Sequence, residues 1–560
     1  MRRLVLLAAL LACAHGPRPV EPERWRELQT EHFVLRTDLG AAEARKMAVD
    51  LEEVRAALLV AGWHSSVEKA GRTQVIALAD GRELEEYALK GIEGFVASDA
   101  FGEPIMVVNG DQDPEEQRFL KHELAHVISN EFLVRNPRWV AEGVACYLET
   151  LRFDRRSGKV VVGEPAKERV EYLSYRPVQS FALTMRLGRE AERMSASEGW
   201  AFETGAWALV HFLVDERGKD FDAMLDRLAK GEDQYYAFSA SFPDLDEGAL
   251  RAGVGAWLKG GKVRIFLVDA PRWAGPVGER TMPRAEVYAV LGDLMRLSPG
   301  YASTPEREQR ERSLLALALA EDPGNPLALR LTESADAGAA TAAHPDDWRA
   351  WLLWADRHNH DLPASRKAAD LAPDNPTVLA RLALAEEGAG RGGDALRHAA
   401  RAVELSPGRS DLLAVYATVL AANGRCSEGN GYAQRAIDVL PDGAGPAAVT
   451  ALTQTRQAIG EHCAKLATTR TRERVVLGTP RSCDQAGPRF GRHDRVRGKL
   501  RAEFVVRADG TVGEVTVSGD ATPGALQAMR KYVQSCRYDP PQGDGETTET
   551  RWQVEFNIRK

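Results

Sequence analysis

Short apolar stretches alternate with longer amphipathic segments over the first half of the chain. LQTEHFVLRTD, RTQVIALAD and GEPIMVVN are short apolar runs that predict strands. Between the first two, the apolar residues of GAAEARKMAVDLEEVRAALLVAGW recur at helical spacing and predict a long helix. Strands followed by more helix predict a mixed α+β domain over residues 27–267, and the segment 268–286 reads as a linker.

Residues 287–467 are rich in Ala and Leu, and their pattern predicts helices throughout. Pro373, Pro407 and Pro441 lie 34 residues apart, with a Gly-bearing turn in the middle of each interval. This period resembles that of tetratricopeptide repeats, which are all-α helical hairpins that bury their apolar faces by stacking. The resemblance implies a module that binds a protein partner. A generic helical bundle or a spacer is the alternative.

The last segment changes character again after a second linker over residues 468–489. GKLRAEFVVRADGTVGEVTVSG predicts two strands around an Asp509-Gly510 turn, followed by a helix and a final strand, RWQVEFNIR. This ββαβ order over residues 490–560 resembles the C-terminal domain of TonB-type proteins. The resemblance implies a small α+β fold with a possible peptide-binding edge strand. It does not extend to energy transduction, because the chain lacks a long Pro-rich spacer.

The chain of 560 residues carries a formal net charge of -8 and no dense stripe of Lys or Arg, which argues against a nucleic-acid partner. Its first residues, MRRLVLLAALLACAHG, predict an export signal over residues 1–12. LLAC resembles a bacterial lipobox, which implies that Cys13 is lipidated and that residues 13–26 form a tether. We therefore expect an envelope protein, an outer-membrane lipoprotein facing the periplasm, held to the membrane by its lipid anchor only. A plain cleaved signal is the alternative.

Cysteine placement fits an exported chain. Cys426 and Cys463 lie in one predicted helical region, and Cys483 and Cys536 lie in the last domain. Disulfides Cys426–Cys463 and Cys483–Cys536 are the expected pairs, with four buried thiols as the alternative.

The segment QRFLKHELAHVISNEF places His122 and His126 four residues apart, with Glu123 directly after the first histidine. Asp113 and Pro114 predict the start of a helix. The apolar stripe of this helix is Leu120, Leu124, Val127 and Ile128. Both histidines fall on the opposite side, one turn apart, where two imidazoles can bind one metal ion. Glu123 is rotated aside, free of the metal but close to anything bound on it.

A second helix follows in RNPRWVAEGVACYLETL, where Glu142 lies sixteen residues after His126. The two motifs together resemble the gluzincin metallopeptidases, the thermolysin-like group. That resemblance implies a Zn²⁺ held by His122, His126 and Glu142, with Glu123 as the base that activates a water for attack on a peptide bond. Gly143 is expected to allow close approach of this helix.

Other residues have weaker assignments. Glu149 lies two turns past Glu142 and could orient a ligand histidine or be an ordinary solvated charge. His211, Tyr172 and Tyr175 are the candidates for stabilising the developing oxyanion, although a lone histidine in WALVHFLV could equally belong to the core.

Together these features predict a multidomain, zinc-dependent metallopeptidase that acts on a peptide or protein substrate. The strand over residues 102–109 resembles the edge strand along which gluzincins bind substrate, or else is an ordinary core strand. Cys146 is expected to be a packing residue that could touch the metal. A catalytically silent zinc- or peptide-binding scaffold is one alternative, and a metallohydrolase of cell-wall peptides or other amides is another.

Overall fold

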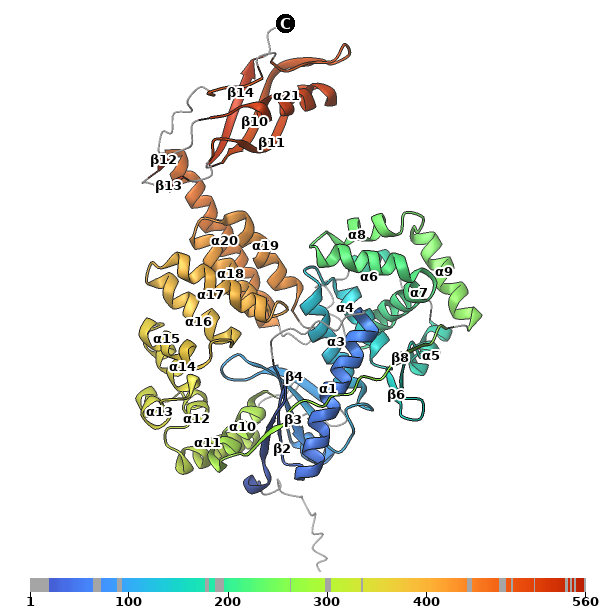
Figure 1. Cartoon of the computed structure of the whole chain (residues 1–560), viewed down its shortest axis with the longest axis vertical. Helices are drawn as coiled ribbons and strands as arrows, with labels where there is room; N and C mark the ends of the chain where they lie inside the picture. The colour runs from blue at the N-terminus through green and yellow to red at the C-terminus, as the bar shows by residue number, and fades with distance from the viewer. Residues whose placement is uncertain are drawn as a thin grey trace, which may run out of the picture. The chain divides into compact units, whose positions relative to one another are not determined.

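The computed structural model describes residues 20–63, 72–87, 93–176, 181–186, 196–261, 263–297, 304–333, 336–440, 446–472, 480–484, 487–507, 509–538, 542–543, 546–547 and 550–557. The protein is mixed α/β and mainly helical (Figure 1). It divides into two compact units, Met1–Lys465 and Leu466–Lys560. The predicted signal over residues 1–12, Cys13 and the first part of the tether lie outside the described residues. No helix of the described chain is both long and apolar enough to cross a bilayer.

The first unit contains a six-stranded sheet with the order β4-β5-β3-β2-β1-β9. The strands are β1 (Arg26–Gln29), β2 (Phe33–Thr37), β3 (Thr73–Leu78), β4 (Gly94–Ser98), β5 (Pro104–Asn109) and β9 (Gly278–Thr281). β2, β3 and β5 run parallel, whereas β4 is antiparallel to β5. The strand predicted over residues 102–109 is β5, which pairs on both sides and is therefore internal. The alternative expectation, an ordinary core strand, is therefore confirmed for residues 102–109, and the edge position belongs to β4.

Helices cover both faces of this sheet. α1 (Ala41–Trp63) and α3 (Arg118–Phe132) pack on one face, in the core that contains Val75 of β3. α10 (Arg284–Leu297) covers the other face, in the core that contains Ile76. Because successive side chains of β3 enter opposite cores, the strand reads as a continuous apolar run rather than an alternating one.

The segment expected to be a linker, 268–286, is partly structured. β8 (Phe266–Asp269) pairs with β7, and β9 (Gly278–Thr281) pairs with β1 at the edge of the large sheet. All four residues of β9 are exposed, so the strand carries no apolar alternation by which the sequence could have revealed it.

Buried charges join three strands at this edge. Glu27 of β1, with only 5% of its side chain exposed, accepts hydrogen bonds at 3.0 Å from Arg36 of β2 and from Arg280 of β9. Burial alone would raise the pKa of Glu27, but the two guanidinium groups lower it to about 2. The charged carboxylate therefore stabilises the folded state above its ordinary pKa of 4.5, and this stabilisation is lost as the pH falls from 4.5 toward 2.

We expect Glu27→Gln to lower the free energy of unfolding by about 3 kcal/mol near pH 6, because the shift spans more than two pKa units. The difference between wild type and variant should shrink toward zero as the pH approaches 2, where the wild-type carboxyl is protonated too. Thermal melts followed by circular dichroism at pH 6 and pH 3 measure this change. An equal difference at both values would contradict the role of the carboxylate charge.

The rest of the first part of the chain surrounds α3 and α4 with helices and a three-stranded sheet of order β6-β7-β8. The remaining elements are η1 (Pro22–Arg24), α2 (Gly81–Tyr87), α4 (Arg138–Leu148), β6 (Arg152–Asp154), β7 (Lys159–Val162), α5 (Lys167–Tyr175), α6 (Phe181–Arg186), α7 (Ala196–Ala229), α8 (Gln234–Ser241) and α9 (Glu247–Gly260).

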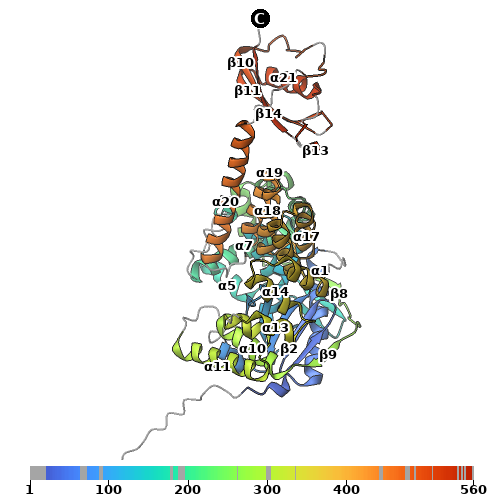
Figure 2. The ribbon, with the colours of Figure 1, turned by 90° about the vertical axis from the view of Figure 1, so that its left-hand side faces the viewer.

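A series of helices follows α10 and contains consecutive hairpins such as α16 with α17 and α18 with α19. Their bounds are α11 (Pro305–Glu321), α12 (Pro326–Leu331), α13 (Ala337–Ala343), α14 (Trp348–Arg357), α15 (Leu362–Leu371), α16 (Pro376–Gly388), α17 (Gly392–Leu405), α18 (Ser410–Ala422), α19 (Cys426–Asp438) and α20 (Pro446–Arg472). We refer to α11–α20 as the helical array. Figure 2 shows α20 as a single long helix, and the disulfide Cys426–Cys463 joins it to α19.

Local sequence sets the helix starts in this array. Asn375 caps α16 by accepting a hydrogen bond from the backbone N–H of Val378 at 2.9 Å, and Pro376 takes the first helical position, where no N–H is needed. Pro373 and Pro407 occupy equivalent turns, three residues before α16 and before α18. Pro441, the third of the periodic prolines, lies outside the described residues.

The second unit is a small α+β fold. β10 (Val496–Val506) lies between β11 (Val512–Ala521) and β14 (Thr550–Asn557) in an antiparallel sheet, on which α21 (Pro523–Ser535) packs. Two further short strands, β12 (Gln542–Gly543) and β13 (Glu546–Thr547), form a separate pair.

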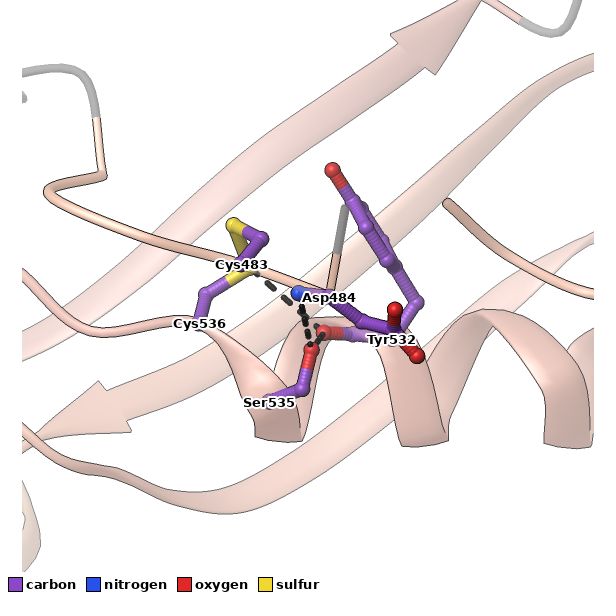
Figure 3. The surroundings of a disulfide bond; sticks show 5 residues. All are labelled: Cys483, Asp484, Tyr532, Ser535 and Cys536. Carbon is purple, nitrogen blue, oxygen red and sulfur yellow. Dashed lines mark hydrogen bonds between the residues drawn. A yellow bond between two sulfur atoms is a disulfide. The ribbon is translucent and has the colours of Figure 1, made fainter. Parts of the chain in front are cut away.

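A disulfide closes the end of α21. Cys536 directly follows the helix and is bonded to Cys483 (Figure 3). Beside it, Ser535 Oγ accepts a hydrogen bond from the backbone N–H of Asp484 at 3.0 Å and donates one to the carbonyl oxygen of Tyr532 at 2.6 Å. The covalent bond therefore fixes the segment that precedes β10 to the far end of α21.

Candidate metal centre

α3 and α4 bring together the three side chains that the sequence singles out as metal ligands. The Nε2 atoms of His122 and His126 lie 3.1 Å apart. Glu142 faces both rings, with one carboxylate oxygen 3.4 Å from Nε2 of His122 and the other 3.6 Å from Nε2 of His126. Glu142 is buried, and the two imidazoles are partly exposed. This cluster of two imidazoles and a carboxylate could hold a metal ion.

α3 begins later than its sequence suggests. Its first residue is Arg118, whereas Asp113 and Pro114 belong to a preceding turn. Lys46 Nζ donates to Asp113 Oδ1 at 2.6 Å, so that carboxylate is engaged away from the helix terminus. The amide of Gln117 instead donates to two carbonyl oxygens of the preceding loop at 2.7 and 2.9 Å and anchors the helix start.

The histidines point away from the core as the helical spacing predicts. Leu120, Leu124 and Ile128 are buried against the sheet, whereas Val127, which was placed in the same stripe, is 38% exposed. Leu120, Leu124 and Ile128 are spaced four apart and stay on one face, and Val127 falls at the margin of that face.

α4 presents two different faces. Glu142, Cys146 and Glu149 recur at helical spacing on the side of the cluster. Gly143 lies on the side that packs against α7, where a Cβ atom would come within 2.7 Å of the carbonyl oxygen of Ala206. The expectation that Gly143 permits close helix approach is confirmed.

We expect Gly143→Ala to lower the free energy of unfolding by about 1–3 kcal/mol, because the new methyl group would meet the backbone of α7, which cannot rotate away. Gly255→Ala is the matched control. Gly255 lies in α9 with open space around its Cβ position, so alanine there should be neutral or stabilise the protein by up to about 1 kcal/mol. Urea unfolding of the two variants measures both effects, and equal values would contradict the proposed packing.

Glu149 supports His122 from behind. Its Oε2 lies 3.0 Å from Nδ1 of His122, so Nδ1–H donates to the carboxylate and Nε2 is left to face the cluster. Arg118 and Arg169 both contact the other carboxylate oxygen of Glu149, the second at 3.4 Å. Burial would raise the pKa of Glu149, but the hydrogen bond from His122 and the two arginines lower it. The carboxylate is thus buried, charged and held in place.

The surroundings of His122 favour positive charge. Burial alone would lower its pKa, but hydrogen bonds with Cys146, Glu142 and Glu149 raise the pKa well above the ordinary value. The groups that favour a proton on the ring also favour a cation beside it. Burial raises the pKa of the Cys146 thiol to about 12, so this cysteine is a neutral packing residue next to His122. With His122 and Glu149 it forms a second group of potential ligands.

Glu123 is half-buried on α3, one residue past His122. At 100° per residue it lies beside both histidines rather than between them. Its carboxylate makes no hydrogen bond or ion pair within the part of the chain that the structure describes. It is therefore available to a molecule that binds at the cluster.

His211 is placed away from the cluster. It lies on α7, is completely buried, and is surrounded by the rings of Tyr147, Trp207 and Trp257 at centroid distances of 5.0–5.3 Å. Burial lowers its pKa to about 4. This environment is that of a core histidine. His211 contacts Tyr147 and His122 faces Glu142, and these two residues project from different sides of α4, so the two histidines lie on different sides of that helix.

The two tyrosines of α5 differ in position. Tyr175 is 81% exposed. Tyr172 is half-buried, and its spacing from Glu168 and Arg169 places it on the side of α5 that faces Arg118 and Glu149. Of the candidate oxyanion donors, Tyr172 is the one on the same side of α5 as Glu168 and Arg169, the partners of Arg118 and Glu149.

Sequence reasoning missed the role of Arg169. This residue is 3% exposed and lies between two carboxylates, 3.4 Å from Glu149 and 3.5 Å from Glu203 of α7, with its guanidinium over the ring of Trp200. Burial and the nearby charge of Glu142 raise the pKa of Glu203. Arg169 links α5 and α7 to the carboxylate that supports His122. No motif marks it, because an arginine in an amphipathic helix usually faces solvent.

A further acidic group, Asp50, Glu53 and Glu115, lies near α1. Asp50 and Glu115 already pair with Lys46 and Arg155 at 2.6 and 3.1 Å. We assign no metal site to this group.

The model of a family described as Protein of unknown function (DUF1570) matches residues 120–232, a stretch that begins two residues before His122 and ends just after α7. It therefore includes His126, Glu142 and Glu149 as well. A search of the curated proteins finds no match to this chain.

Proposed function

We propose that this protein is a zinc-dependent metallopeptidase whose metal ligands are His122, His126 and Glu142. The observation that supports this proposal most directly is the spacing of the donor atoms, which lie 3.1–3.6 Å from one another. Ligand atoms about 2.0–2.1 Å from a tetrahedral zinc lie about 3.3 Å apart, so the cluster matches that ion. Three protein donors leave the fourth position open, as catalytic rather than structural zinc sites do.

The residues around the cluster divide the chemistry between them. Zinc held there would supply Lewis-acid chemistry, which makes a water acidic near neutral pH and polarises a peptide carbonyl. Glu123 takes a proton from the attacking water and delivers it to the leaving amine. Glu149, fixed by Arg118 and Arg169, holds the ring of His122 in the orientation that presents Nε2.

Strand β4 is the proposed docking strand for an extended substrate. This strand lies at the edge of the sheet. It is also next to α3, which we call the metal helix because it carries His122 and His126: Phe119 of α3 packs against Gly94 at the start of β4. Main-chain groups of an edge strand can pair with a peptide, as in β-strand addition. Tyr172 is the proposed partner of the oxyanion, on the basis of its register on α5.

The remaining parts complete the proposal. The helical array is proposed to have a tetratricopeptide-like fold and to bind a protein partner, and the second unit is proposed to have a TonB C-terminal-like fold and to bind peptide. Cys13 is proposed as the lipid attachment site, which would hold the protein at the outer membrane facing the periplasm.

Metal analysis combined with a peptide-library digest tests the function. Purified protein should contain about one zinc per chain and cleave a subset of the library, and chelation should abolish cleavage until zinc is returned. Including cell-wall peptides in the library tests the wider amide-hydrolase alternative. Zinc-free protein that neither binds nor uses the metal would overturn the proposal.

The silent scaffold is the second candidate. One observation favours it: none of the described tyrosine or histidine side chains contacts the cluster as an evident oxyanion donor, apart from the ligands themselves. Protein that holds zinc yet cleaves nothing across the library would establish this alternative. The partner-free position of Glu123 argues for turnover, because a scaffold has no use for a base there.

A further inference from the structure

The turn that joins β4 to β5 is enclosed by the helical array. Phe101, at the tip of the turn, is 1% exposed and lies in an apolar cluster with Leu329, Leu353 and other residues of α12–α14. The ring of Trp348 meets it edge-on at 5.7 Å, and the guanidinium of Arg330 lies 4.8 Å from its centre. In Figure 1 the helices from α10 to α19 trace an arc, with β4 on its inner side. A large aromatic side chain at an otherwise polar turn is thus buried by helices more than 200 residues later in the sequence.

The backbone of the same turn is bonded to three helices of this region. The N–H of Ala100 donates to Asp293 of α10 at 3.1 Å, and the carbonyl oxygen of Ala100 accepts from Arg330 of α12. The carbonyl oxygen of Gly102 accepts from Arg409 at the start of α18 at 2.7 Å. Gly102 has φ of +90°, a conformation that other residues rarely adopt. These bonds hold the turn in one conformation, since each carbonyl or amide has a charged partner.

The turn of the array that contains Arg409 also contacts α3, the helix that carries both histidines. The side chain of Arg409, 13% exposed, pairs with Glu103 at 3.3 Å. The preceding residue, Gly408, approaches α3 so closely that a Cβ atom would overlap that of Asn130. Asn130 lies one turn past His126 on the same stripe of α3. One turn of the array, Pro407–Arg409, therefore contacts both the end of the β4–β5 hairpin and the helix that carries the histidines.

We propose that the helical array is an internal clamp that positions edge strand β4 against the metal helix α3, with Phe101 and Arg409 as its positioning residues. The occupant of this face of the array is the protein's own hairpin rather than a separate partner. The importance of the clamp for substrate rests on the proposed function, because β4 is the strand along which a peptide would bind. The mechanical coupling itself does not depend on catalysis.

A clamp and ordinary packing differ in which part of the protein changes when the contact is removed. Packing alone would change the stability of the array and the sheet together. A clamp predicts a local effect in a strand that Arg409 does not touch, because the bonded turn transmits its position to Gly94–Ser98.

Hydrogen exchange of the full-length protein tests the coupling without any substrate. We expect Arg409→Gln to accelerate exchange of the β4 amides at least about tenfold, with the melting temperature of the array little changed. Arg401→Gln is the matched control, because Arg401 is half-exposed and pairs with Asp374 and Glu404 within the array. Phe101→Leu keeps an apolar side chain in the cluster and should also accelerate exchange of the β4 amides. It replaces Arg409→Gln as the test if that variant folds poorly.

Kinetics separate the clamp from the proposed activity. Arg409→Gln should raise KM severalfold while kcat and zinc content stay near wild type, since the metal ligands and Glu123 are untouched. Unchanged β4 exchange in both Arg409→Gln and Phe101→Leu would overturn the clamp. A third outcome is that the wild-type protein binds zinc but cleaves no peptide, while Arg409→Gln still accelerates β4 exchange. That result would support the clamp and reject the proposed peptidase activity.

Discussion

Glu123→Gln should retain about one zinc per chain and lose hydrolysis by a factor of about 10²–10⁴. Glutamine keeps the size of the side chain and its place beside the histidines, but it cannot accept a proton from the attacking water. Because Glu123 makes no hydrogen bond or ion pair in the described structure, the substitution leaves the surrounding network intact. The expected loss is therefore in kcat, with KM and folding nearly unchanged.

Metal content by mass spectrometry and kcat on the best library peptide measure this effect. Glu116→Gln is the control, because Glu116 is exposed in the turn before α3 and lies outside the cluster. A variant that keeps more than about a tenth of wild-type kcat would show that another group is the base.

His126→Ala should abolish both zinc retention and hydrolysis, because it removes one of three converging donors and leaves a site with two. Glu149→Ala should instead weaken zinc binding by about 10–100-fold, since that residue acts through the orientation of His122. His126→Ala should lower the zinc affinity more than Glu149→Ala, because His126 would bind the ion directly whereas Glu149 only orients the ring of His122.

Competition with a chromogenic zinc chelator gives the affinities of both variants. Equal zinc affinity in His126→Ala and wild type would place the metal elsewhere, for example at the group formed by His122, Cys146 and Glu149. A Glu149→Ala variant as weak as His126→Ala would indicate that Glu149 itself coordinates the ion.

The convergence of His122, His126 and Glu142 could be predicted from the sequence, because helical spacing fixes the sides from which side chains project. His122 and His126 are one turn apart, and Glu142 lies on the next helix, so a short connection brings them together. The register of Glu149, directly after α4, likewise predicted its position beside His122, a proposed ligand.

Long-range pairing was beyond the sequence. β4 and β5 are both short apolar strands, and no local signal shows which of them lies at the edge of the sheet. Arg169 and Arg409 have no motif because their partners are distant in the chain. The sequence leaves His211 either a catalytic or a core residue, and its aromatic surroundings are those of a core residue.

The return of the chain to the sheet at β9 has a consequence for synthesis and for fragments. A polypeptide that stops at residue 267 would leave β1 paired with β2 alone, and it would lose α10, which covers one apolar face of β3 and β5. During synthesis the N-terminal sheet cannot finish folding until residues through Leu297 have emerged, because α10 covers one of its faces. Useful truncations therefore end after α10 rather than at the apparent domain boundary.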